Sequence, residues 1–132
     1  MIDYSKLETG QQLSSQSVSL NAKAVGDYVA AVGDTSSPTA SDGSSLVPPM
    51  AIAALALSAV INALQIPGGT IHASQELGFC AAVPVGSKVE CTATLAQNSV
   101  RRNWRFLVVN MEATSEGGGV VMEGKGTIML PA

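Results

Sequence analysis

Few side chains in this sequence could carry acid–base chemistry. The chain has one histidine, His72, so any catalysis by an imidazole must use it. Asp34 and Asp42 lie in a segment rich in serine and threonine. A carboxylate there can move protons, or it can close a turn by accepting from local backbone N–H groups. Both interpretations stay open for Asp34, whereas Asp42 precedes a glycine and is favoured as a turn residue. For His72, a buried and hydrogen-bonded imidazole on a strand is favoured over a catalytic one.

Nucleophilic and metal chemistry are disfavoured. Ser41, Ser44 and Ser45 share one loop, but the chain has no Gly-x-Ser-x-Gly elbow and no second histidine. Cys80 and Cys91 have no Cys-x-x-Cys spacing and one histidine to join them, so a zinc site is not expected. We expect two half-buried thiols in a reducing compartment, and no metal or redox cofactor.

Composition favours one folded domain over residues 1–132. Apolar residues make up 46% of the chain, which excludes disorder as the main state. Charged residues make up 13%, and the net charge is -3. The basic residues form no run beyond Arg101–Arg102, so a nucleic-acid footprint is absent. The N-terminal stretch has no leader-like apolar region, and we expect a cytoplasmic protein.

Periodicity predicts an α+β fold in which an antiparallel sheet wraps one long apolar helix. The expected elements are a strand at 17–20, helices at 22–32 and 49–65, and strands at 71–79, 87–97, 104–114 and 120–130. Residues 1–12 are polar and are expected to begin as a loose segment. Gly124 and Gly126 within the last strand predict a bulge or a close backbone contact.

The second helix lies in a segment, residues 43–75, that contains no charged side chain. Pro48–Pro49 and the polar Ser58 and Asn62 argue against a membrane span, and we expect a helix buried on nearly every side. The strand at 104–114 is apolar on both faces, which predicts a central or interface position. One helix cannot cover a long sheet and its edges, so pairing with another chain is expected.

Three segments resemble the MaoC-like dehydratase and hydratase family, which has the hot-dog fold. Residues 28–34 (YVAAVGD) resemble the stretch before the family's catalytic loop, and residues 47–51 (VPPMA) resemble the start of its central helix. Residues 72–79 and 84–89 resemble a strand and turn of the non-catalytic, N-terminal-type MaoC domain. The resemblance covers roughly residues 16–130.

The resemblance implies addition or removal of water across the α,β double bond of an acyl thioester. Active members share a Gly-Asp-x-Asn-Pro-x-His motif. This chain keeps Gly-Asp at 33–34 and Pro38, but it has serine at 36 and 37 and Thr39 or Ala40 where the histidine belongs. The implied protein is a hydro-lyase acting on 3-hydroxyacyl or 2-enoyl thioesters of coenzyme A or an acyl carrier protein.

The resemblance also assigns roles to individual residues. Asp34 would be the catalytic acid or base, and His72 the one imidazole able to assist it. The backbone N–H of Met50, at the start of the central helix, would polarise the thioester carbonyl. We also expect Ser41, Arg101 and Arg102 to bind substrate. The arginines would hold phosphate groups of coenzyme A or of a carrier-protein arm. The other interpretation of the arginines is a solvated edge.

Two alternatives stay open because the Asn and His of the motif are missing. The chain could be a catalytically silent hot-dog subunit that binds the acyl chain and pairs with a catalytic partner. Such pairing would be a homodimer or a heterodimer with another hot-dog chain. Thioester hydrolysis is the third possibility, but that activity usually uses an acid on the central helix, and none occurs at 47–65.

Overall fold

The computed structural model describes residues 2–132. Its elements are η1 (Tyr4–Lys6), β1 (Gln12–Ser19), α1 (Ala22–Val32), α2 (Pro49–Leu64), β2 (Ile71–Phe79), β3 (Lys88–Arg101), β4 (Trp104–Ser115) and β5 (Val120–Pro131). The bounds of α1 and β2 are those predicted, and α2, β4 and β5 differ from prediction by one residue at their C-terminal ends. The expected combination of one long helix with an antiparallel sheet is confirmed.

Two strands are longer than predicted. β1 begins at Gln12 rather than at residue 17, because its backbone pairs with β3 although most of its side chains are polar. β3 continues past Gln97 to Arg101, because the hairpin with β4 resumes after an irregularity between Leu95 and Gln97. Pairing between backbones therefore extends both strands beyond what side-chain alternation reveals.

The prediction of a loose N-terminal segment is wrong. The Tyr4 hydroxyl donates to the carbonyl oxygen of Leu64, at 2.7 Å. The side-chain amide of Asn98 donates to the carbonyl oxygens of Tyr4 and Leu7, at 2.8 and 2.9 Å. These bonds join residues far apart in the chain, so no local pattern announces them. They fix the segment beside the C-terminal end of α2.

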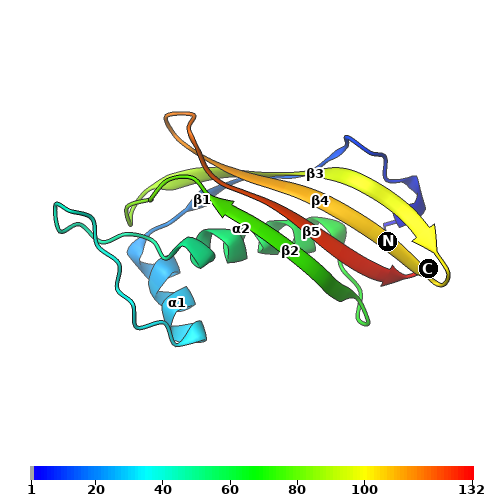
Figure 1. The fold of residues 1–132 in the computed structure, drawn as a ribbon, viewed down its shortest axis with the longest axis horizontal. Helices are drawn as coiled ribbons and strands as arrows, with labels where there is room; N and C mark the ends of the chain where they lie inside the picture. The colour runs from blue at the N-terminus through cyan, green and yellow to red at the C-terminus, as the bar shows by residue number, and fades with distance from the viewer. Residues whose placement is uncertain (1) are drawn as a thin grey trace.

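The five strands form one antiparallel sheet in the order β1-β3-β4-β5-β2. Helix α2 lies along one face of this sheet, which curves over it, and α1 packs near one end (Figure 1). We call the face toward α2 the inner face and the opposite one the outer face. β1 and β2 are the edge strands, and β4 is central, as its two apolar faces predicted.

The core lies between α2 and the inner face. The helix contributes small side chains such as Ala56 and Ala59, which let its backbone approach the sheet, and the sheet contributes larger ones such as Leu107 and Leu130. The prediction that α2 is buried on nearly every side is wrong, because Met50 and Ile61 are 51% and 41% exposed. One sheet covers one side of a helix, and the other side stays open.

Candidate active site

The loop that carries Asp34 begins where α1 ends. Asn21 caps the start of α1, since its Oδ1 accepts the backbone N–H of Ala24 at 2.8 Å. Gly33 ends the helix in a left-handed conformation, with φ of 69°, and its glycine identity makes that conformation inexpensive. Asp34 therefore directly follows the glycine that ends the helix.

Asp34 closes a turn in this structure. Its Oδ1 accepts the backbone N–H of Ser36 at 2.8 Å, and the side chain is half-buried. Hydrogen bonds from Ser36 lower the pKa of the Asp34 carboxyl, so it is ionised at neutral pH. The turn interpretation of Asp34 therefore holds geometrically, and a role in proton transfer stays a prediction.

Asp42 repeats the same local geometry at the tip of the loop. Its Oδ1 accepts from the backbone N–H and the hydroxyl of Ser44, at 2.9 and 2.6 Å, and these bonds lower the pKa of the Asp42 carboxyl. The predicted turn role is confirmed. Ser41 lies exposed in the same turn, and none of the cavities described below has Ser41 in its lining.

The start of α2 presents a free backbone donor. Pro49 occupies the first turn and has no N–H, and the N–H of Ala51 bonds the carbonyl of Pro48 at 2.9 Å. Within residues 2–132 the N–H of Met50 makes no such bond. An unpaired N–H at a helix N-terminus is suited to a carbonyl oxygen that gains negative charge.

An apolar cavity of about 330 Å³ lies between α1, the loop and the start of α2. Val25 and Val29 of α1 line one side, and Pro38, Leu46 and Pro48 line the other. The loop is held there because the N–H of Leu46 bonds the carbonyl of Pro38 at 2.9 Å. Asp34, the loop and Met50 thus share one end of the molecule.

His72 lies toward the other end of α2. Its ring lines a second cavity, of about 280 Å³, with Leu57 and Ile61 of α2 and Ile128 of β5. Ile61 is eleven residues beyond Met50, a rise of roughly 16 Å along the helix. Within one chain, the structure therefore does not bring His72 together with the end that carries Asp34 and Met50.

Arg101 and Arg102 lie at the turn between β3 and β4, near the C-terminal end of α2, and so also far from Met50. The guanidinium of Arg101 sits over the Phe106 ring, 5.5 Å from its centroid. Arg105 donates to Asn98 Oδ1 at 2.8 Å, which ties it to the N-terminal segment. Phosphate binding by these arginines stays a prediction.

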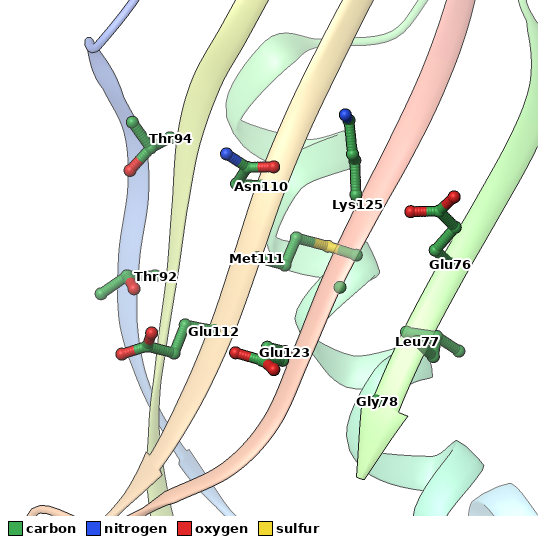
Figure 2. A pocket seen from close by; sticks show the side chains of 11 residues that line it. Glu76, Leu77, Gly78, Thr92, Thr94, Asn110, Met111, Glu112, Glu123 and Lys125 are labelled. Carbon is green, nitrogen blue, oxygen red and sulfur yellow. The ribbon is translucent and has the colours of Figure 1, made fainter.

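A hollow of about 720 Å³ lies on the outer face of the sheet (Figure 2). Glu112 of β4 stands directly opposite Glu123 of β5, and Lys125 stands opposite Glu76 of β2. The two acids for which the sequence offered no partner, Glu76 and Glu112, thus belong to a polar outer face. It faces away from α2, the loop and His72.

The two cysteines differ more than expected. Cys80 is exposed and Cys91 is buried, so the prediction of two half-buried thiols is wrong. Neighbouring positions of a strand face opposite sides of a sheet, and Cys91 faces inward. Within residues 2–132, no group of three or more His, Cys, Asp and Glu side chains is arranged to hold a metal ion.

Sequence reasoning missed Gln75. Its Oε1 lies 3.0 Å from Nε2 of His72, and its Nε2 donates to the backbone carbonyl of Glu76 at 3.1 Å. Residues three apart in a regular strand face opposite sides, so the spacing argued against this contact. A β-bulge between His72 and Ser74 brings the two side chains to the same face.

Comparison with known proteins decides the family. A family model described as the FAS1-like dehydratase domain region matches residues 8–124. The chain belongs to this family. Among curated proteins, none matches the chain by sequence.

Solved structures show the fold of this FAS1-like dehydratase-region protein. The (R)-hydratase PhaJ1 of Pseudomonas aeruginosa superimposes with a TM-score of 0.80, at 22% identity, covering 97% of this chain and 84% of that one. A MaoC-like dehydratase from Rhodospirillum rubrum gives 0.76, at 15% identity, over 96% and 94%. The (3R)-hydroxyacyl-ACP dehydratase complex HadBC of Mycobacterium tuberculosis gives 0.74, at 17% identity, over 92% and 96%. The MaoC-like hot-dog fold is therefore confirmed.

Proposed function

We propose that this member of the FAS1-like dehydratase-region family binds 3-hydroxyacyl or 2-enoyl thioesters and catalyses the reversible addition of water to their double bond. The acyl group would be carried by coenzyme A or by an acyl carrier protein. The observation that carries the proposal is the free Met50 N–H at the start of α2, at the same end as the loop with Asp34.

Each group at this end has a defined task in the proposed reaction. The ionised carboxylate of Asp34 would accept a proton from the attacking water, whose oxygen bonds to the β-carbon while a proton goes to the α-carbon. Negative charge then develops on the thioester oxygen, and the Met50 N–H would stabilise it with help from the dipole of α2. His72 is the one imidazole available to assist.

A second candidate function is a silent subunit that shapes an acyl site while another hot-dog chain supplies a complete motif. The separation of Asp34 and His72 along α2 favours it. Serine at 36 and 37 and Thr39 or Ala40 also leave the loop without the family's amide and imidazole. The two candidates make different predictions for the isolated chain.

Pairing with a second hot-dog chain is part of the proposal, as a homodimer or a heterodimer. β2 is an edge strand, and Phe79 at its end and Ile61 on the adjacent side of α2 are 40% and 41% exposed. Burying them against another chain would also cover the unpaired edge. No helix within residues 2–132 is long and apolar enough to cross a membrane. A cytoplasmic location stays a prediction.

The test is hydration of short and medium trans-2-enoyl-CoA by the purified chain, with Asp34→Asn and Asp42→Asn measured beside it. Asparagine keeps the oxygen that accepts the Ser36 or Ser44 N–H, so both variants preserve the turn. We expect at least a hundredfold loss of kcat for Asp34→Asn, in the range of general acid–base catalysis, and unchanged kcat for Asp42→Asn.

Equal activity of the wild type and Asp34→Asn would refute the role of Asp34. No turnover by the folded wild-type chain would refute independent catalysis and favour the silent subunit. Binding of the same thioesters without turnover would then support the acyl-site function of that subunit. Isothermal titration calorimetry measures this binding.

A further inference from the structure

The side-chain amide of Gln75 has one possible orientation. One end of it lies 3.1 Å from the carbonyl oxygen of Glu76, which can accept but not donate a hydrogen bond. That end must therefore be the NH₂ group. The other end, Oε1, is then an acceptor, and it lies 3.0 Å from Nε2 of His72.

An acceptor at this position decides where the imidazole of His72 carries its proton. A neutral imidazole has one N–H and one nitrogen lone pair, and two acceptors facing each other at hydrogen-bond distance repel. The proton must therefore be on Nε2. Nδ1 is left with the lone pair, and it makes no hydrogen bond among residues 2–132.

The backbone is shaped to allow this contact. The β-bulge places His72 opposite Ile128 and Gln75 opposite Gly126, two positions apart on β5 and hence on one face. A Cβ at position 126 would lie 2.7 Å from Oε1 of Gln75, closer than such atoms come. Because glycine has no Cβ, position 126 leaves the space that the side-chain amide of Gln75 occupies.

The imidazole borders an apolar cavity. Besides Leu57, Ile61 and Ile128, its lining includes Ile66 and the backbone at Gly68. The charged groups of β2 and β5 nearest in sequence, Glu76 and Lys125, lie on the outer face instead, where they line the outer hollow (Figure 2). His72 is an exposed residue at the edge of this cavity, so the lone pair of Nδ1 is accessible as a hydrogen-bond acceptor.

We propose that Gln75 is a positioning residue that holds His72 as the Nε2–H tautomer, so that Nδ1 is the acceptor the imidazole offers to a ligand. The ligand class that fits is an apolar chain carrying a hydroxyl. That hydroxyl is the 3-hydroxyl of the acyl chain or the water that forms it, an identification that rests on the proposed function.

The test uses nitrogen NMR on the ¹⁵N-labelled, tag-free chain. His72 is the one histidine, so its two ring nitrogens need no separation from others. The spectrum is recorded over a series of pH values and interpreted where the ring-nitrogen shifts no longer change with increasing pH. We expect a pyrrole-type shift for Nε2 and a pyridine-type shift for Nδ1.

Four variants separate positioning from general structure. In Gln75→Leu the acceptor is gone, and we expect the two shifts to move toward each other as the tautomers mix. Gly126→Ala should have the same effect by displacing the Gln75 amide. Gly78→Ala on the outer face of β2, where the added Cβ meets only ordinary contacts, should leave the shifts unchanged. Gln75→Glu keeps an acceptor and should retain the Nε2–H tautomer.

A wild type protonated on Nδ1 would overturn the proposal. So would an unchanged spectrum in Gln75→Leu, which is the decisive variant if Gly126→Ala does not fold. Because the spectrum is recorded without substrate, this result is independent of whether the chain hydrates enoyl thioesters.

Discussion

Cys91 and Cys80 lie on one chain in opposite environments, and their chemistry should differ accordingly. Burial, and to a lesser degree the negative charge of Glu90, raises the pKa of the Cys91 thiol to about 11. The thiolate is the reactive form, so Cys91 is protected twice, by its pKa and by its burial. Cys80 is exposed, so burial does not protect it.

We expect a thiol reagent to label one cysteine in the native chain and two in the unfolded chain, with Cys80→Ser abolishing the native reaction. Labelling of both thiols in the native chain would contradict the structure.

The raised pKa of Cys91 also has a consequence for stability. A folded-state pKa above the unfolded value of 9.0 favours folding below pH 9, and that contribution is lost as the pH rises toward about 11. Urea unfolding across this range should show a steeper loss in wild type than in Cys91→Ala.

At the residue scale, the sequence identified some features and could not reveal others. Glycine at 124 and 126 predicted a close approach, which is confirmed, because a Cβ at either position would meet Gln75, Glu76 or Leu77 at 3.3 Å or less. The contact of His72 with Gln75 was not predictable, since it depends on a bulge with no signature in residue type. The turn at Asp42 was predictable because an aspartate before a glycine accepts hydrogen bonds from nearby backbone N–H groups.

At the element scale, the two sides of helix α2 differ in burial and should therefore tolerate different side chains. Ala56 is 3% exposed against the sheet, whereas Ala54 is exposed two residues earlier. Alanine and leucine have similar helix propensities, so propensity does not distinguish the two sites. Packing alone should decide what a larger side chain does at each.

We therefore expect Ala56→Leu to lower the free energy of unfolding by about 1–3 kcal/mol, the usual cost of overpacking. Ala54→Leu should change it by no more than about 0.5 kcal/mol, as at other surface sites. Urea denaturation followed by circular dichroism measures both. Equal losses in the two variants would mean that α2 is covered on both sides.

The bounds of most elements were predictable because their apolar residues repeat with a regular period. Helix α1 carries Asn21 and Gly33 at its ends, and both act as the caps that their types suggest. β1 was underestimated because an edge strand of serine and glutamine has no apolar alternation to detect. The exposed side of α2 was missed because a uniformly apolar sequence does not mark which side meets the sheet.

At the scale of the whole molecule, exposed large apolar side chains occur on α2, at Ile61, and on the edge strand β2, at Ile71 and Phe79. A sheet edge beside apolar side chains is poorly suited to solvent, which is why we place the second chain there. Ile61 tests this placement, and Val100 provides the control, since it is 51% exposed near the opposite margin of the sheet, on β3.

We expect Ile61→Lys to convert a dimer to a monomer, or to raise its dissociation constant at least tenfold, because the interface would then bury a charge. Val100→Lys should leave the mass unchanged. Sedimentation equilibrium measures both. A wild-type chain that is monomeric at high concentration would leave only heterodimer formation, and a dimer unaffected by Ile61→Lys would place the interface elsewhere.

The strand order has a consequence for how the chain acquires its structure. β3, β4 and β5 are consecutive and adjacent, so they form a meander from local contacts. β1 and α2 also contact strands that come later in the chain, because β1 pairs with β3 and α2 packs on β3 and β4. During synthesis from the N-terminus, the apolar helix emerges before any sheet exists to cover it. We expect β3–β5 to assemble first and the older half of the chain to dock onto it, so that the slow step is the closing of long loops rather than the formation of any element.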